Sequence, residues 1–268
     1  MADYEQICLE TKKIAKTAGD FIRAESKEFS AKSIEVKGVH NFVSYVDKEA
    51  EKMLVGRLQE ILPEAGFIAE EGTRSHRGER FDWVIDPLDG TTNFIHGLPP
   101  HAVSIGLLEN GRPVLGVVYE ITLDECFYAW KDAPAYLNGK EIRVSERTSV
   151  QDSLIATGFP YCDYQFMRAY IDCLEYFLRN SHGVRRLGSA AVDMAYVACG
   201  RFDAFYEYSL NPWDVAGGAI ILQQAGGRLS DFSGGEDFIF GKEIVAANDA
   251  VFDEFLNIVQ KYLKKNKK

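Results

Sequence analysis

The chain has 268 residues, of which 46% are hydrophobic, and its 40 acidic and 30 basic side chains give a net charge of −10. This acidic balance argues against general binding to nucleic acid or to anionic membranes, since both need a basic face. The start of the chain is acidic, its longest charge-free run is broken by prolines, and its five scattered cysteines form no paired motif. We therefore expect a cytoplasmic protein with reduced thiols and no transmembrane segment.

Apolar residues recur at helical spacing over residues 3–28 and again over about 47–62. The period then changes to that of strands, with short buried runs at 67–69 and 81–85. Asn-Gly pairs favour tight hairpin turns, so Asn110-Gly111 predicts pairing of 101–109 with 113–122, and Asn138-Gly139 predicts a second hairpin. The first half is thus expected to be helices followed by an antiparallel meander.

The second half alternates between strand and helix patterns, which is typical of a layered α/β arrangement. Polar, turn-like residues at 145–152 are the best candidate boundary, so we expect an N-terminal α+β half at 1–148 and a C-terminal α/β half at 149–268. The expected elements are strands at 153–157, 183–187, 202–208, 228–232 and 243–247, and helices near 163–179, 189–199, 213–225 and 249–264.

The densest chemical signal runs from Trp83 to Phe94. An apolar strand leads into Asp86, which we expect at the end of that strand, and Asp89 precedes a glycine and two threonines. Two carboxylates beside the N–H groups of a tight turn suit a joint site for Mg²⁺ and phosphate. The alternative is that Asp89 only forms a turn and Asp86 only caps it.

Other acids are weaker signals when each is taken alone. Asn211 and Pro212 predict a helix start, with Asp214 in the first turn, where an acid also favours the helix dipole. Glu207 lies in an aromatic strand, and spacing leaves open whether it points outward or into a cleft. Glu70 follows an apolar strand and Asp47 begins a helix, where either could be an ordinary surface or capping residue.

Taken together, Glu70-Glu71, the stretch 86–94 and the stretch 213–218 closely resemble the inositol monophosphatase family of Mg²⁺-dependent phosphatases, over residues 37–248. The resemblance implies a five-layered α-β-α-β-α sandwich of mixed α+β and α/β class. It further implies a homodimer, inhibition by lithium, and two or three bound Mg²⁺ ions.

The resemblance also assigns roles to single residues. Glu70, Asp86 and the Leu88 carbonyl would hold the first ion, Asp86, Asp89 and Asp214 the second, and a weaker third ion would share Glu70. A group of acids packed without cations would repel one another, so such a cluster makes physical sense as a metal site.

The remaining roles concern the phosphate, the water and the alcohol. Asp47 would orient the Thr91 hydroxyl, and Thr91 with Glu70 would position and deprotonate the attacking water, making these three the catalytic residues. Lys37 remains available near the third ion or the phosphate, although Asn41 and Ser44 depart from the family pattern. The substrate would contact Leu88, Asp89, Gly90, Thr91, Gly188, Ser189, Ala190, Glu207 and Asp214.

We therefore expect hydrolysis of a small phosphomonoester, with myo-inositol 1-phosphate as the default substrate. The same site in similar proteins serves fructose 1,6-bisphosphate, 3′-phosphoadenosine 5′-phosphate or histidinol phosphate, and Arg185 and Arg186 keep a bisphosphate open. The basic segment 73–80 is either a solvated loop or a lid. A different class of function, a non-catalytic regulatory binding role, stays as an alternative.

Overall fold

The computed structural model describes residues 2–27, 34–38, 41–160 and 163–263, with the backbone alone for 34–38 and 41–44. The helices are α1 (Tyr4–Glu25), α2 (Tyr45–Ile61), α3 (Thr91–Ile95), α4 (Met167–Asn180), α5 (Ala190–Ala198), α6 (Pro212–Gln224) and α7 (Asp249–Leu263), with a short 3-10 helix η2 (Val150–Asp152). None of the described helices is long and apolar enough to span a membrane.

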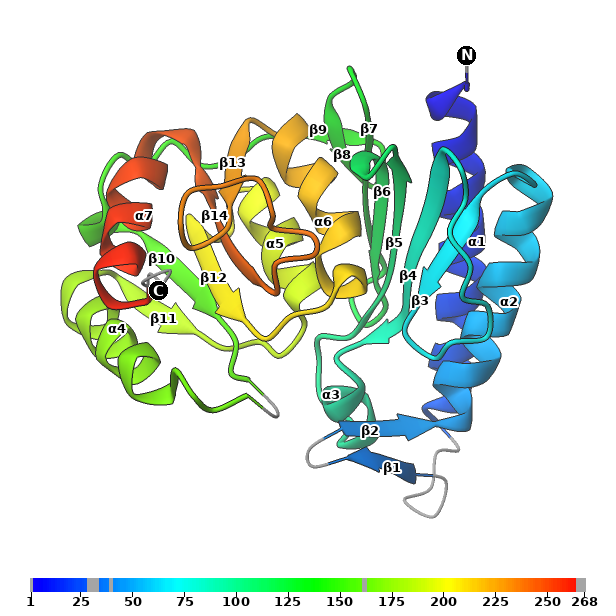
Figure 1. The fold of residues 1–268 in the computed structure, drawn as a ribbon, viewed down its shortest axis with the longest axis horizontal. Helices are drawn as coiled ribbons and strands as arrows, with labels where there is room; N and C mark the ends of the chain where they lie inside the picture. Colours follow the sequence, from blue (N-terminus) through cyan, green and yellow to red (C-terminus); the bar gives the residue numbers. More distant parts are fainter. Residues whose placement is uncertain (1, 28–33, 39–40, 161–162, 264–268) are drawn as a thin grey trace.

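Helices and sheets alternate in five layers, which Figure 1 shows side by side. Helices α1 and α2 form one outer layer, α5 and α6 the middle layer, and α4 and α7 the other outer layer. A sheet lies between each pair of helical layers. The expected α-β-α-β-α sandwich is therefore confirmed.

The larger sheet has seven strands in chain order, β3 to β9, and only β3 and β4 run parallel. Both expected Asn-Gly hairpins are present, because Asn110, Gly111, Asn138 and Gly139 all have the positive φ that such turns require. The strands are β3 (Gly66–Ala69), β4 (Phe81–Asp89), β5 (Ala102–Glu109), β6 (Arg112–Glu120), β7 (Glu125–Trp130), β8 (Ala135–Leu137) and β9 (Lys140–Ile142).

The smaller sheet has the order β11-β10-β12-β14-β13, with β10 parallel to both β11 and β12, and β14 antiparallel to its neighbours. A separate antiparallel pair, β1 with β2, lies near α3 (Figure 1). The strands are β1 (Ile34–Gly38), β2 (Asn41–Ser44), β10 (Leu154–Thr157), β11 (Gly183–Arg185), β12 (Ala204–Tyr208), β13 (Gly227–Ser230) and β14 (Glu243–Asn248).

Helix α6 lies unusually close to the larger sheet because glycines face one another. A Cβ atom built on Gly116 of β6 would be 2.1 Å from the Gly217 carbonyl oxygen, and one built on Gly217 would be 2.8 Å from Ser104 Oγ. A Cβ on Gly106 would be 2.8 Å from the Ala216 Cβ. The absence of side chains at these glycines therefore lets helix and sheet backbones meet.

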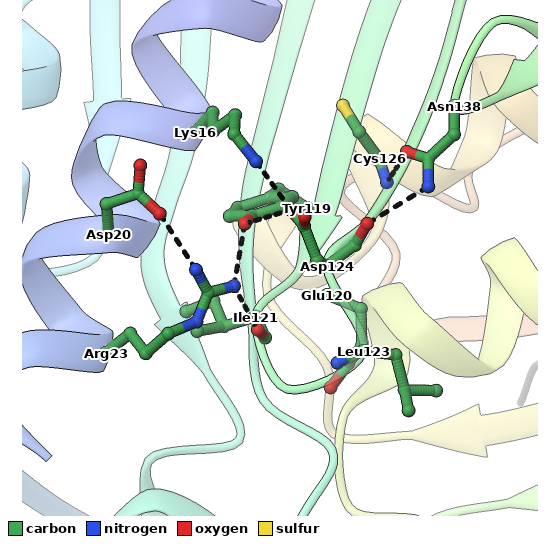
Figure 2. Close-up of polar contacts among 10 residues, drawn as sticks. All are labelled: Lys16, Asp20, Arg23, Tyr119, Glu120, Ile121, Leu123, Asp124, Cys126 and Asn138. Carbon is green, nitrogen blue, oxygen red and sulfur yellow. Dashed lines mark hydrogen bonds and ion pairs between the residues drawn. The ribbon is translucent and has the colours of Figure 1, made fainter.

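On the opposite face of the same sheet, α1 is fastened to the turn between β6 and β7 (Figure 2). Lys16 Nζ donates to Asp124 Oδ1 at 2.6 Å, and Arg23 donates to the Tyr119 hydroxyl at 2.8 Å. Tyr119 in turn donates to Asp124 at 2.7 Å, although its ring is fully buried. These contacts set the position of the outer helical layer.

Most expected elements lie within about three residues of the observed ones, and two departures are informative. The strand expected at 81–85 continues to Asp89, and β7, which was not predicted, completes the meander. Among the described cysteines, Cys8, Cys126 and Cys173 are buried and unpaired. The division into halves at 148 and 149 stays a prediction.

Candidate metal and phosphate site

Three carboxylates from distant parts of the chain meet at one point. Asp86 and Asp89 come from β4, and Asp214 comes from the first turn of α6 in the middle layer. One oxygen from each of the three lies within 4.8 Å of the others, and Asp86 and Asp89 are buried. Oxygen donors at this spacing are the ligands that hard divalent cations prefer.

A break in the strand pairing places the first two acids on the same site. Strand β4 pairs with β5 up to Asp86, opposite Ser104, and resumes at Asp89, opposite Ala102, with an irregularity between them. The Leu88 N–H donates to Asp86 Oδ1 at 2.9 Å across this bulge. Our expectation that Asp86 ends the strand was wrong, because Pro87 is accommodated in the bulge and pairing continues beyond it.

The start of α6 fixes the third acid as the sequence predicts. Asn211 precedes the helix in an extended conformation and Pro212 is its first residue. The Asn211 N–H donates to Asp214 Oδ2 at 2.6 Å, which holds the carboxylate at the helix start.

Electrostatics at the cluster favour a bound cation. Burial raises the pKa of Asp86 well above its usual value, and the charges of Glu70, Asp89 and Asp214 raise it further. Burial also raises the pKa of Asp214, as does the charge of Asp89, and burial raises that of Asp89 to about 6. A divalent cation would relieve this repulsion, so the donor set fits Mg²⁺.

A threonine hydroxyl lies beside the cluster. Thr91 Oγ1 is 3.1 Å from Asp47 Oδ1 and 2.9 Å from the Leu88 carbonyl oxygen. Asp47 is buried in the first turn of α2, so its carboxylate is held rigidly. The contact between Asp47 and Thr91 is the one that the family resemblance implies.

Glu70 follows β3, and its N–H donates to the Ile85 carbonyl at 3.2 Å, which carries the pairing of β3 and β4 one residue further. The loop after it is held by Glu51, a residue that the sequence analysis missed. Glu51 is fully buried and accepts from the N–H groups of Glu71 and Thr73, each at 2.7 Å. Its position four residues after Asp47, on the same helix face, was the available signal.

The turn after Asp89 has no room for a side chain at Gly90. Gly90 has φ +88°, and a Cβ there would be 3.0 Å from the Pro100 carbonyl oxygen and 3.3 Å from that of Gly188. Asn93, also missed as a functional residue, donates from Nδ2 to the carbonyls of Pro100 and Leu187, each at 2.8 Å. It therefore ties the turn to the segment before α5.

The start of α5 contacts the cluster directly. Ser189 Oγ donates to Asp89 Oδ2 at 2.6 Å, and the Ala191 N–H donates to the same oxygen at 2.8 Å. Gly188 has φ +91°, a conformation that favours glycine. The substrate contacts expected for Gly188, Ser189 and Ala190 stay predictions, and the structure gives Ser189 a role in holding Asp89.

Glu207 lies on β12 and is buried, with only 7% of its surface exposed. Its pKa is raised to about 8, mainly by burial and in addition by the charge of Asp89, against the opposing charge of Arg186. A Cβ on Gly158 would be 2.1 Å from the Glu207 carboxylate, so the carboxylate lies against bare backbone. The sequence left open whether Glu207 points outward or inward, and in the structure its side chain points inward.

Two further expectations concerned Lys37 and the basic segment 73–80. The side chain of Lys37 is outside the part of the chain whose side chains are described. The basic segment 73–80 is bound to the start of β4, since Arg77 Nε donates to Asp82 Oδ2 at 2.9 Å and the Gly78 N–H donates to Asp82 Oδ1 at 2.8 Å. These bonds favour an anchored loop over a lid.

The chain is similar to known proteins along nearly its whole length. The model of the inositol monophosphatase family matches residues 3–264. Nus factor SuhB of Pseudomonas aeruginosa is 40% identical over 254 residues, which cover 93% of this chain and 94% of that protein. The fructose-1,6-bisphosphatase/inositol-1-monophosphatase of Thermotoga maritima is 40% identical over 222 residues, covering 83% and 84% of the two chains.

A solved structure matches equally well. The extragenic suppressor protein suhB of Bartonella henselae superposes with a TM-score of 0.90 and 35% identity, covering 97% of this chain and 99% of that one. Both the sequence and the layered fold therefore agree with one group of proteins, which includes proteins named as phosphatases and as Nus factors.

Proposed function

This chain belongs to the inositol monophosphatase family, and from that premise we propose that it hydrolyses a small polyol phosphomonoester with the help of Mg²⁺. The observation that carries the proposal is the meeting of two buried acids, Asp86 and Asp89, with half-buried Asp214, one oxygen of each lying within 4.8 Å of the others. We propose myo-inositol 1-phosphate as the substrate, in a cytoplasmic homodimer.

In this proposal Asp86, Asp89 and Asp214, with Glu70 and the Leu88 carbonyl, would hold two or three Mg²⁺ ions. Bound Mg²⁺ supplies positive charge for the phosphate and the leaving alkoxide and lowers the pKa of water. The rate of unassisted phosphomonoester hydrolysis is so low that such charge compensation is required.

The protein's own groups would orient the attack. Thr91, bonded to Asp47, holds the water, and Glu70 accepts its proton. The N–H groups of the turn after Asp89 face the phosphate oxygens, since Gly90 leaves the backbone bare there. With the water fixed opposite the ester oxygen, in-line attack on phosphorus needs no covalent intermediate.

On the alcohol side, Glu207 would accept hydrogen bonds from the hydroxyl groups of the polyol. Its burial against Gly158 supports this, because a carboxylate fixed in one position favours one arrangement of hydroxyls. The name of the Thermotoga protein pairs inositol monophosphate with fructose 1,6-bisphosphate, so the latter is the first competing substrate.

The test is phosphate release from myo-inositol 1-phosphate, fructose 1,6-bisphosphate, 3′-phosphoadenosine 5′-phosphate and histidinol phosphate, with Mg²⁺ and with or without lithium. We expect the inositol ester to give the highest kcat/KM and lithium to inhibit. Asp89→Asn is the control, and full activity in that variant would overturn the metal mechanism. A faster reaction with another ester would overturn only the choice of substrate.

The second candidate is a regulatory binding role in an RNA-associated complex. It is favoured by the 40% identity to a protein named a Nus factor, over nearly the whole of both chains. The two roles separate in a strain that lacks this gene. If the binding role dominates, Asp89→Asn restores growth as well as the wild type does; if hydrolysis dominates, it does not.

A further inference from the structure

Asp193 is a buried acid to which neither the sequence pattern nor the proposed mechanism gives a role. It lies on α5, in the middle layer, and only 1% of its surface is exposed. Its neighbours along the helix are alanine, valine and methionine, so it interrupts an otherwise apolar surface. A carboxylate in such a place costs several kcal/mol unless something compensates it.

Other buried acids of this protein show what compensation looks like. Asp203, which is 6% exposed, accepts from the Leu154 N–H at 2.6 Å and from the Ser145 hydroxyl. Fully buried Glu120 accepts from the N–H groups of its own turn, and Glu51 from two N–H groups of the loop after β3. The fold thus supplies donors where a carboxylate is structural.

Asp193 has no such donors. Among the side chains that the structure describes, it is the one whose two carboxylate oxygens are both sealed from solvent and both without a hydrogen-bond partner. A donor for these oxygens must therefore come from an internal water or from a bound ligand.

The surroundings of Asp193 indicate what that donor is. Its pKa is raised well above the usual value by burial, and further by the charges of Glu207 and Asp89, while Arg186 lowers it. Asp193 follows Ser189, the residue that donates to Asp89, by one turn of α5, and α5 packs against β12, the strand that carries Glu207. Asp193 is more deeply buried than Glu207. The guanidinium of Arg186 is 6.0 Å from the Phe159 ring and is itself exposed.

We propose that Asp193 is a specificity-determining residue for the alcohol half of the substrate, a second hydroxyl-accepting carboxylate that acts behind Glu207. A polyol presents several O–H donors on neighbouring carbons, and one internal water can relay such a donor from Glu207 to the sealed oxygens of Asp193. An alcohol without further hydroxyls gains nothing from the pair. The inference rests on the proposed function and narrows its substrate class to hydroxyl-rich esters.

The test compares two substrates in wild type, Asp193→Asn and Asp193→Leu. For myo-inositol 1-phosphate we expect KM to rise about tenfold in the Leu variant and less in the Asn variant, which keeps one acceptor oxygen. The kcat should stay within about threefold, because the metal ligands are untouched. For phenyl phosphate, which has no hydroxyl beside the ester, KM should change less than about twofold.

Asp203→Asn is the matched control, since it alters a buried acid that has a structural role. We expect it to lower the melting temperature and to affect both substrates equally. An equal rise in KM for both esters in the Asp193 variants, or none for either, would overturn the proposal. If Asp193→Leu does not fold, the Asn variant alone decides. A wild-type protein that hydrolyses neither ester would instead overturn the proposed function.

Discussion

Two regions of this molecule hold acidic side chains in opposite ways. Beside α1, Asp124 accepts from Lys16 and from Tyr119, and Glu120 accepts from the Leu123 N–H at 2.6 Å (Figure 2). At the cluster, Asp86, Asp89 and Asp214 face one another, and the charges that raise the pKa of Asp86 and of Asp214 come from other acids.

The pKa shifts of the two regions have opposite signs. The Lys16 and Tyr119 hydrogen bonds lower the pKa of Asp124, whereas burial and three like charges raise that of Asp86. The difference teaches that the same residue type is paired with a protein cation in one place and lies among like charges in the other, where a bound cation would relieve the repulsion. Four changes would break or sharpen this contrast.

The largest effect is expected for Asp86→Asn, which removes the acid at the centre of the cluster. We expect kcat/KM for phosphate release to fall by at least about 10³-fold, because the first and second metal ions would lose the ligand that they share. Asp124→Asn, a matched change in the region beside α1, should leave kcat/KM within about twofold. A loss of less than tenfold in Asp86→Asn would show that the cluster is not the catalytic centre.

Mg²⁺ should stabilise the folded protein through the cluster alone. At a hundredfold excess over its Kd the ion adds about 2.7 kcal/mol to the free energy of unfolding, a rise in melting temperature of roughly 5–10 °C for a chain of this size. Calorimetry with Mg²⁺ or EDTA measures it. The rise should persist in Asp124→Asn and shrink in Asp214→Asn; an equal rise in both would place the ion elsewhere.

Glu207 should make the metal-free protein less stable as pH rises. Its pKa is about 8 when folded and about 4.5 when unfolded, so between these values the native state binds more protons and stability falls. Glu207→Gln lacks this loss, so its free energy of unfolding relative to wild type should grow from pH 5 to 8 by on the order of 3 kcal/mol. Urea unfolding in EDTA tests this, and curves that differ by a constant would contradict it.

The smallest effect is expected beside α1. Arg23→Met removes hydrogen bonds to the Tyr119 hydroxyl, the Ile121 carbonyl and Asp20, all from a side chain that is 36% exposed. The free energy of unfolding should drop by only about 0.5–1 kcal/mol, since solvent screens such pairs. Urea denaturation gives the value. The kcat should not change. A large loss of kcat would mean that contacts of α1 influence the acidic cluster.

Most of the fold could be predicted because its elements are long and regularly patterned. The Asn-Gly turns fixed two hairpins, and Pro212 fixed the start of α6. Strand β4 was predicted too short because a proline normally ends pairing, and only the bulge between Asp86 and Asp89 shows how the strand passes it.

The sequence indicated which acidic residues belong to the site, but it did not show which of them lie in contact. Spacing alone could not bring Asp214 to Asp86 and Asp89, since nothing local encodes contact between residues so far apart; the family resemblance supplied that. Glu51 and Asp193 were missed because each looks like an ordinary helix residue. A lone acid in the apolar helix α5 was nevertheless a signal, since burial without a partner is costly.

The glycine contact between α6 and the larger sheet has a consequence for precision. Because Gly116 faces the Gly217 carbonyl without an intervening side chain, the spacing between β6 and α6 is set by backbone atoms. Side chains can change rotamer and absorb small errors, whereas bare main chain cannot. The same helix carries Asp214, so the distance of Asp214 from Asp86 and Asp89 depends on a direct contact between backbones. Such a fixed distance suits Mg²⁺, which demands near-ideal octahedral coordination.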